Sequence, residues 1–169
     1  AVPATGEPLR FGYWGNLTSR KGVPVLVRAF RAAVEAGLAG PAELHLFGAC
    51  DTPELERALR ALADGLPIVF HGRFDYAQLA AAGMHCAVFP MVCFETWGFV
   101  LDEAFELGLP AIVSDLGAIP GRAGAAALRV PPGDVAAMAA AIASLVAAPA
   151  RLGELRAAVR RSSLTLDGH

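Results

Sequence analysis

Two glutamates flank a tryptophan–glycine pair near the middle of the chain. Glu95 and Glu103 stand eight residues apart, with Trp97 and Gly98 between them and a predicted helix starting at Gly98. The unpaired N–H groups of a first helical turn can bind an anion or a hydroxyl group. Carboxylates in such a loop accept hydrogen bonds from sugar hydroxyls. One glutamate here would be only a favourable charge beside a core tryptophan, but two in this arrangement indicate a site for a hydroxylated, anionic ligand.

A second polar loop lies near the start of the chain, from Gly15 to Gly22, and reads Gly-Asn-Leu-Thr-Ser-Arg-Lys-Gly. Its small residues let backbone N–H groups approach an anion, and Lys21 adds a full positive charge. The loop is equally compatible with a phosphate cradle and with an ordinary strand-to-helix turn carrying a solvated Arg20–Lys21 pair. It matches neither G-x-x-x-x-G-K-S/T nor G-x-G-x-x-G, which excludes those two nucleotide-binding fingerprints.

Composition excludes several other classes of protein. The chain has 169 residues, 55% hydrophobic and 18% charged, with a net charge of −2. This suits one domain with a real core, and it is too apolar for a disordered chain. No basic block suggests a nucleic-acid partner, and the longest apolar run, 135–148, is shorter than the roughly 20 residues of a membrane span. Three cysteines without C-x-x-C spacing favour free thiols in a reducing compartment.

Short apolar segments alternate with longer amphipathic ones. We predict strands over 9–13, 42–47, 68–71, 86–89, 111–114 and 128–130, and helices over 23–36, 53–63, 76–82, 98–107, 135–147 and 149–161. Thr52, Asp75 and Asp134 are the expected N-caps. The strands are apolar almost throughout, which is typical of strands covered on both faces. The sequence therefore predicts an α/β fold, a doubly wound (Rossmann-like) parallel sheet of about six strands with helices on both faces.

In this fold the loops after the strands meet at one edge of the sheet, where ligands bind. The rule selects the loops 15–22, 48–51, 71–75, 90–98 and 114–121. The two unusual loops described above are among them. Beside them, Trp14 is expected to lie in the core or in a pocket wall. Cys93 has no evident base, so we expect no nucleophile there. We expect a hydrogen-bonded, structural His45 within its strand and an exposed His85 just before one.

The motifs together resemble the large retaining "group 1" (family 4) glycosyltransferases of the GT-B fold, over nearly the whole chain and in the same order. Gly15-x-Leu17-x-x-x-Lys21-Gly22 resembles the family's G-R-L-x-x-x-K-G, and 95–104 resembles its E-x-F-G-x-x-x-x-E-A signature. The segments 108–112, 114–117 and 132–134 are similar to further family turns. The resemblance is to the carboxyl-terminal half. It implies that residues 1–169 form a single nucleotide-sugar-binding domain whose amino-terminal, acceptor-binding domain lies outside the chain.

The resemblance implies a diphosphate site built from both loops. Lys21 would neutralise the diphosphate of the sugar donor, and the backbone at Gly15, Gly98, Phe99 and Val100 would line it. Asn16 stands where many family members carry a diphosphate-binding arginine. Arg20 is the expected substitute for that charge. A second departure, Gly121 in place of a common glutamate, is minor.

The sugar, ribose and base are assigned in the same way. Glu95 would bind hydroxyls of the transferred sugar, next to Trp97, and Glu103 would hold the ribose hydroxyls. The stretch after the third strand, with His71 and Arg73, resembles the family's base-contacting loop.

The implied reaction is transfer of a hexosyl group from a nucleoside diphosphate sugar with retention of configuration. Lys21 and helix N–H groups would stabilise the leaving diphosphate in place of a metal ion. Lys21 and Glu95 are the two expected catalytic residues. No D-x-D occurs in the sequence, and no metal or other cofactor is expected. The chain alone should bind the donor but turn over slowly or not at all. The resemblance implies a cytoplasmic enzyme that reaches the inner face of a membrane only through the domain outside the chain.

Two other interpretations remain open. A flavodoxin-like interaction module without catalysis would show the same alternation of elements, and half of a related sugar-nucleotide epimerase shares the architecture. A phosphorylated receiver is disfavoured, because Gly15 and Asn16 follow the first strand where clustered acids would be needed. The third strand is followed by Gly72 and Arg73, where a receiver carries its aspartate.

Overall fold

A computed structural model of the chain describes residues 1–159. Six parallel strands form one sheet in the order β3-β2-β1-β4-β5-β6. The strands are β1 (Leu9–Trp14), β2 (Ala42–Phe47), β3 (Ile68–Gly72), β4 (Cys86–Phe89), β5 (Ala111–Ser114) and β6 (Ala127–Val130). Each agrees with the predicted strand to within one residue at either end. The predicted fold class, a doubly wound parallel sheet, is confirmed.

Six helices lie close to their predicted positions. They are α1 (Val23–Glu35), α2 (Pro53–Ala63), α3 (Tyr76–Ala81), α4 (Phe99–Glu106), α6 (Val135–Ala147) and α7 (Pro149–Ala157). The three predicted N-caps are confirmed: Thr52 Oγ1, Asp75 Oδ1 and Asp134 Oδ1 each accept a backbone N–H three residues on, at 2.8–3.1 Å. The prediction for α7 was too long, because 158 and 159 are not helical. Its predicted end at 161 and the polar segment 162–169 lie outside the described residues.

A short helix, α5 (Ile119–Ala123), and a 3-10 turn, η1 (Gly124–Ala126), were not predicted. The α5 sequence contains Pro120 and Gly121, which favour turns over helices. Pro120 is tolerated because it stands in the first turn, where its missing N–H would have no helical acceptor. Buried Ile119 and Ala123 fix the helix against the sheet.

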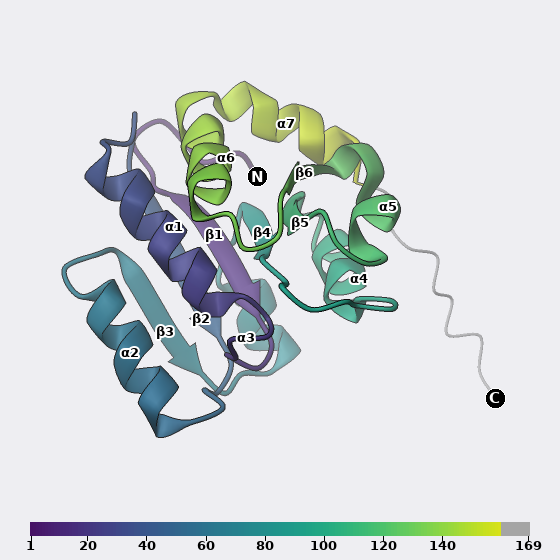
Figure 1. Cartoon of the computed structure of the whole chain (residues 1–169). Coiled ribbons are helices and arrows are strands. Elements are labelled where there is room, and N and C mark those ends of the chain that lie inside the picture. The colour runs from purple at the N-terminus through teal and green to yellow at the C-terminus, as the bar shows by residue number, and fades with distance from the viewer. Residues whose placement is uncertain (160–169) are drawn as a thin grey trace.

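Helices cover both faces of the sheet (Figure 1). On one face α1 lies between α2 and α6 and contacts both, and the buried side chains there include Phe11, Leu26, Phe30, Leu44 and Ile142. On the other face α3, α4 and α5 pack on the strands through a second cluster that includes Trp14, Phe47, Phe89, Leu101 and Phe105. Full burial of each such side chain contributes about 1.5–3 kcal/mol, so the two clusters hold the sheet between the helix layers.

His85 is buried, with 6% of its surface exposed, so the expectation of an exposed side chain was wrong. The residue continues the pairing of β4 with β1. Its N–H donates to the Arg10 carbonyl at 2.9 Å, and its Nδ1 accepts from the Arg10 N–H at 2.9 Å. Burial, followed by the Arg10 charge, lowers the pKa of His85. A neutral imidazole therefore lies between the inner strands β1 and β4, at the amino-terminal end of β4.

Within residues 1–159, no single helix is both long and apolar enough to cross a membrane. Helices α6 and α7 reach that length and composition only as a pair, and they meet at an angle of 99°.

Gly22 allows the loops after β1 and β4 to touch. It is the N-cap of α1 with a φ of 75°, and a Cβ there would lie 1.7 Å from the Pro90 carbonyl oxygen. Beside this contact, the Val92 N–H donates to the Arg20 carbonyl at 3.2 Å. The backbones of the two loops therefore pack directly, with no side chain between them.

This contact predicts an unequal cost for two glycine-to-alanine changes. Gly37→Ala should cost about 1 kcal/mol of unfolding free energy, because Gly37 has a φ of 87° but open space around it. Gly22→Ala should cost about 1–3 kcal/mol more, since its methyl group also clashes with Pro90. Urea unfolding followed by circular dichroism measures both. Equal losses in the two variants would show that the loops do not pack as described.

Candidate functional site

The connections that leave the carboxyl-terminal edge of the sheet turn in opposite directions at the neighbouring strands β1 and β4. The chain leaves β1 toward β2 on one side, and it leaves β4 toward β5 on the other. Such a switch point leaves a crevice between the two loops, which is where open α/β sheets bind ligands. The loops 15–22 and 90–98 flank this crevice, as the sequence predicted.

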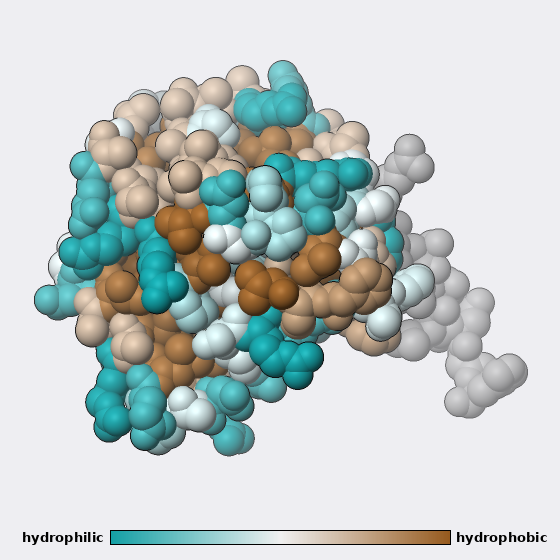
Figure 2. Space-filling model, viewed as in Figure 1, coloured by the Kyte–Doolittle hydropathy of each residue, from teal (hydrophilic) through white to brown (hydrophobic). Residues whose placement is uncertain are grey.

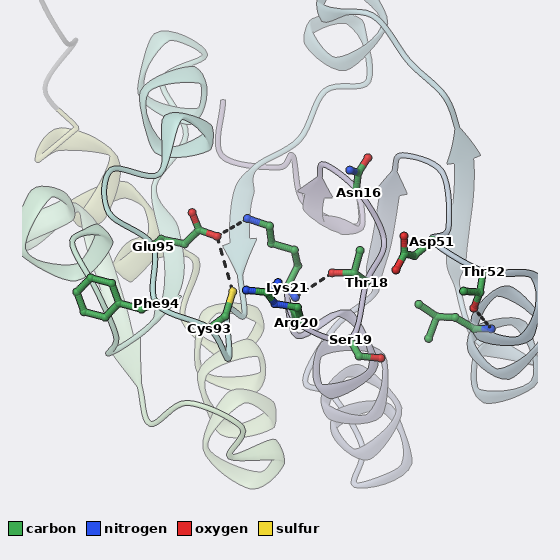
Figure 3. Close-up of a pocket in the computed structure, with 11 residues that line it drawn as sticks. Asn16, Thr18, Ser19, Arg20, Lys21, Asp51, Thr52, Cys93, Phe94 and Glu95 are labelled. Carbon is green, nitrogen blue, oxygen red and sulfur yellow. Dashed lines mark hydrogen bonds and ion pairs between the residues drawn. The ribbon is translucent and has the colours of Figure 1, made fainter.

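Lys21 and Glu95 form an ion pair across the crevice. Figure 3 shows the Lys21 ammonium and the Glu95 carboxylate pointing toward each other from the two loops. Both are partly exposed, with 35% and 21% of their side-chain surface accessible. Partly exposed pairs of this kind are weak. An arriving anion can therefore replace Glu95 as the partner of Lys21 at small cost.

Two further contacts surround the ion pair. The backbone N–H of Lys21 donates to Thr18 Oγ1 at 3.1 Å, which closes the turn before α1. Cys93 Sγ lies 3.8 Å from Glu95 Oε1 (Figure 3). The thiol acts here as a weak donor to the carboxylate.

Two cavities meet at this ion pair. The first, which we call the central cavity, has a volume of about 460 Å³ and is lined by Tyr13, Trp14, Gly15, Asn16, Lys21, Met91, Glu95, Thr96, Trp97, Gly98, Phe99 and Val100. It contains eight of the predicted site residues. The second, the polar cavity, has a volume of about 520 Å³ and shares Asn16, Lys21 and Glu95 with the first. Both volumes are in the usual range for small-molecule sites.

Arg20 lines the polar cavity but not the central one. The residue next to Lys21 therefore faces a different part of the site. Asn16 lines both cavities, so an amide stands where the resemblance led us to consider an arginine. Tyr13 fixes this part of the loop, because its hydroxyl donates to the Asn16 carbonyl at 2.7 Å. Burial, and then the Glu95 charge, raises the pKa of Tyr13 and keeps this donor protonated.

Helix α4 begins inside the central cavity. Gly98 is its N-cap with a φ of 76°, and no side chain caps the helix. The first N–H groups of a helix have no intrahelical acceptor. At Phe99 and Val100 these groups are available at the cavity wall, together with the positive end of the helix dipole.

Glu103 is held by Trp14. The Trp14 Nε1–H donates to Glu103 Oε2 at 2.8 Å. Trp14 is buried and packs edge-on against Phe89, with ring centroids 5.1 Å apart, while it also lines the central cavity. Both expectations for Trp14, core and pocket wall, are therefore correct. Glu103 itself does not line that cavity but stands behind it, oriented by the indole.

His71 and Arg73 lie together in a third cavity of about 350 Å³, between the end of β3 and α3. The His71 ring stacks on Phe47 with centroids 3.9 Å apart and planes 2° from parallel. His71 Nε2 lies 2.8 Å from His45 Nδ1, and His45 Nε2 lies 3.0 Å from Glu43. His45 is thus the hydrogen-bonded, structural histidine that the sequence predicted. Burial, and then the neighbouring His45, lowers the pKa of His71.

Several lining residues were not predicted. Asp51 and Thr52 line the polar cavity (Figure 3), and Phe47, Phe74 and Gln78 line the third cavity. Asp51 could have been found, because its loop was among those selected at the strand ends. Phe47 could not, since a buried aromatic residue at the end of a strand has no local sign of a ligand contact.

Among residues 1–159, no three His, Cys, Asp or Glu side chains gather in a group that could hold a metal ion. The cysteines Cys50, Cys86 and Cys93 are free thiols, and burial raises the pKa of Cys86.

Solved structures of known proteins share this fold. Anabaena HepE, in a complex with UDP and glucose, superposes with a TM-score of 0.75 at 18% identity, over 90% of this chain and 42% of HepE. Sucrose-phosphate synthase from Thermosynechococcus elongatus superposes with a TM-score of 0.70 at 27% identity, over 93% of this chain and 41% of the synthase. The chain thus spans about two fifths of either protein.

Sequence comparison identifies the family. A phosphatidyl-myo-inositol mannosyltransferase of Mycobacterium leprae (strain TN) is 37% identical over 135 residues, which are 75% of this chain and 34% of that protein. The chain spans about one third of this relative. The family model described as "Glycosyl transferases group 1" matches residues 8–148. With that match over most of its length, the chain belongs to the group 1 glycosyltransferase family.

Proposed function

We propose that this chain is the donor-binding domain of a retaining, metal-independent glycosyltransferase, which transfers a sugar from a nucleoside diphosphate sugar to an acceptor. One observation carries the proposal. Lys21, Glu95 and the uncapped start of α4 face a single cavity at the switch point of the sheet. Family membership and this arrangement support the same ligand, which must be both anionic and rich in hydroxyl groups.

The diphosphate is assigned to Lys21 and the start of α4. Charge-assisted hydrogen bonds from an ammonium and from backbone N–H groups are the strong kind, and they stabilise charge that grows on the leaving diphosphate. When the diphosphate takes Lys21 as its partner, Glu95 is released from the ion pair. Its carboxylate is then free to accept hydrogen bonds from the transferred sugar.

The nucleoside is assigned to a position outside the lining of the central cavity. Glu103, which Trp14 orients there, accepts the ribose hydroxyls. The base lies in the third cavity, where the stacked rings of His71 and Phe47 offer an aromatic surface and Arg73 offers hydrogen-bond donors. The names of two similar proteins are compatible with such a ligand, since one is a mannosyltransferase and the other is solved with UDP and glucose.

The acceptor is assigned to the part of the enzyme outside this chain, because the similar proteins are two to three times as long. Phe94 and Phe99, each with 71% of its surface exposed, are large apolar side chains beside the site. Figure 2 shows one face of the molecule, on which apolar residues lie among polar ones. We propose that Phe94 and Phe99 face the acceptor domain. The chain alone then binds the sugar nucleotide with little or no turnover.

Lys21→Met should weaken binding of UDP, GDP or ADP about tenfold to a hundredfold, because charge-assisted hydrogen bonds contribute about 1.5–3 kcal/mol. Binding of the corresponding nucleosides should not change, and EDTA should have no effect on any of these affinities. Isothermal titration calorimetry measures them. Arg28→Met, which removes an exposed positive charge from α1, the helix that follows the Lys21 loop, is the matched control. If Lys21→Met weakens nucleosides and diphosphates equally, its assignment is wrong. If the unaltered chain binds no nucleotide at millimolar concentration, a non-catalytic interaction module is the better interpretation.

Glu103→Gln should weaken the nucleoside itself, about threefold to tenfold, because an amide accepts a ribose hydroxyl less strongly than a carboxylate does. Titrating the preferred nucleoside into the variant measures the loss. Glu106→Gln, an exposed position three residues further along α4, serves as its control. An affinity for the nucleoside equal to that of the unaltered chain would remove Glu103 from the ribose.

A further inference from the structure

The loop from Glu95 to Gly98 is held from outside by α5, a helix that contributes nothing to the lining of the central cavity. Arg122 of α5 donates through one guanidinium nitrogen to the Trp97 carbonyl at 2.7 Å and to the Gly98 carbonyl at 3.3 Å. Its other terminal nitrogen pairs with Asp102. One side chain therefore binds three consecutive parts of the site: the loop, the N-cap and the first turn of α4.

Asp102 completes a closed network of hydrogen bonds. Only 5% of its surface is exposed, and each of its oxygens has a partner: Oδ1 pairs with Arg122, and Oδ2 accepts from Trp97 Nε1 at 3.0 Å. The guanidinium also lies over the Trp97 ring, 4.0 Å from its centre. A buried carboxylate is tolerated only when such partners satisfy it, so the three residues depend on one another.

The turn that precedes α5 holds the same loop. The Ala118 N–H donates to the Glu95 carbonyl at 3.0 Å. A Cβ on Gly98 would lie 2.5 Å from Cγ1 of Ile119, so the two residues are in close contact. The segment from Ala118 to Arg122 thus fixes the backbone at both ends of the loop.

The direction of these contacts matters for the site. In a trans peptide the carbonyl and the N–H point in opposite directions. Arg122 binds the carbonyls of Trp97 and Gly98, so the N–H groups in the same two peptide planes, those of Gly98 and Phe99, point away from α5. Both of these residues line the central cavity. Arg122 therefore sets the direction in which the two N–H donors are presented.

We infer that Arg122, together with Asp102 and Trp97, is a positioning residue for the diphosphate: it touches no ligand and acts by aiming the N–H groups of Gly98 and Phe99. The inference rests on the proposed function, since it takes the diphosphate as the ligand of those groups. It adds to the site a helix that local sequence did not predict.

Titration with inorganic pyrophosphate, a nucleoside diphosphate and its nucleoside tests the inference. Arg122→Met should weaken the two phosphate ligands about tenfold and leave the nucleoside unchanged, since about one charge-assisted hydrogen bond is lost or misdirected. Arg122→Lys should recover part of the affinity, because an ammonium can still pair with Asp102 but cannot form the planar fork. Arg60→Met is the control: Arg60 also pairs with a carboxylate and covers an aromatic ring, but on α2.

Amide hydrogen exchange in the absence of any ligand gives an independent measurement. Arg122→Lys should increase exchange at Gly98 and Phe99 relative to the unaltered chain and to Arg60→Met, even if Arg122→Met does not fold. Unchanged exchange at both amides, or equal losses for nucleoside and pyrophosphate, would overturn the positioning role. Failure of the unaltered chain to bind any of the ligands would instead overturn the proposed function, which the exchange data do not depend on.

Discussion

No side chain fits between Gly22 and the Pro90 carbonyl, and the site depends on this close approach of two loops. The loops belong to neighbouring parallel strands whose chains turn to opposite sides, so they meet only at the carboxyl-terminal edge of the sheet. Because their backbones touch, Lys21 of one loop reaches Glu95 of the other. The crevice is therefore narrow enough for one ligand to contact both.

The electrostatics of the site follow from that geometry. The positive charge of Lys21 is balanced by Glu95, so neither charge is left without a partner in the site. A bound diphosphate would exchange one negative partner for another. In the proposed complex, the carboxylate released in this way accepts hydrogen bonds from the transferred sugar. One ion pair thus serves both parts of the proposed donor.

Support for the site comes from residues outside the two loops, on β1 and α5. Trp14 is packed in the second core cluster, and its one hydrogen bond to Glu103 fixes the orientation of that carboxylate. Arg122 fixes the backbone at the start of α4 through its contacts with Trp97 and Asp102, which are also hydrogen-bonded to each other. In both cases a residue outside the loops orients a polar group at or next to the central cavity. Such support keeps a binding site close to its working geometry without a ligand.

The sequence by itself determined the fold class, five of the six strand starts and the three side-chain caps, because these follow from apolar spacing and from interactions within about four residues. It also identified the two loops, through motifs whose residues lie close together in the chain. Only the tertiary structure decided which distant groups meet. Trp14 and Glu103 are 89 residues apart in the sequence, and Asp102 and Arg122 are 20 residues apart. The burial of His85 and the formation of α5 were likewise decided by packing against the sheet. Such contacts depend on the order of the strands, which the local pattern of residues does not encode.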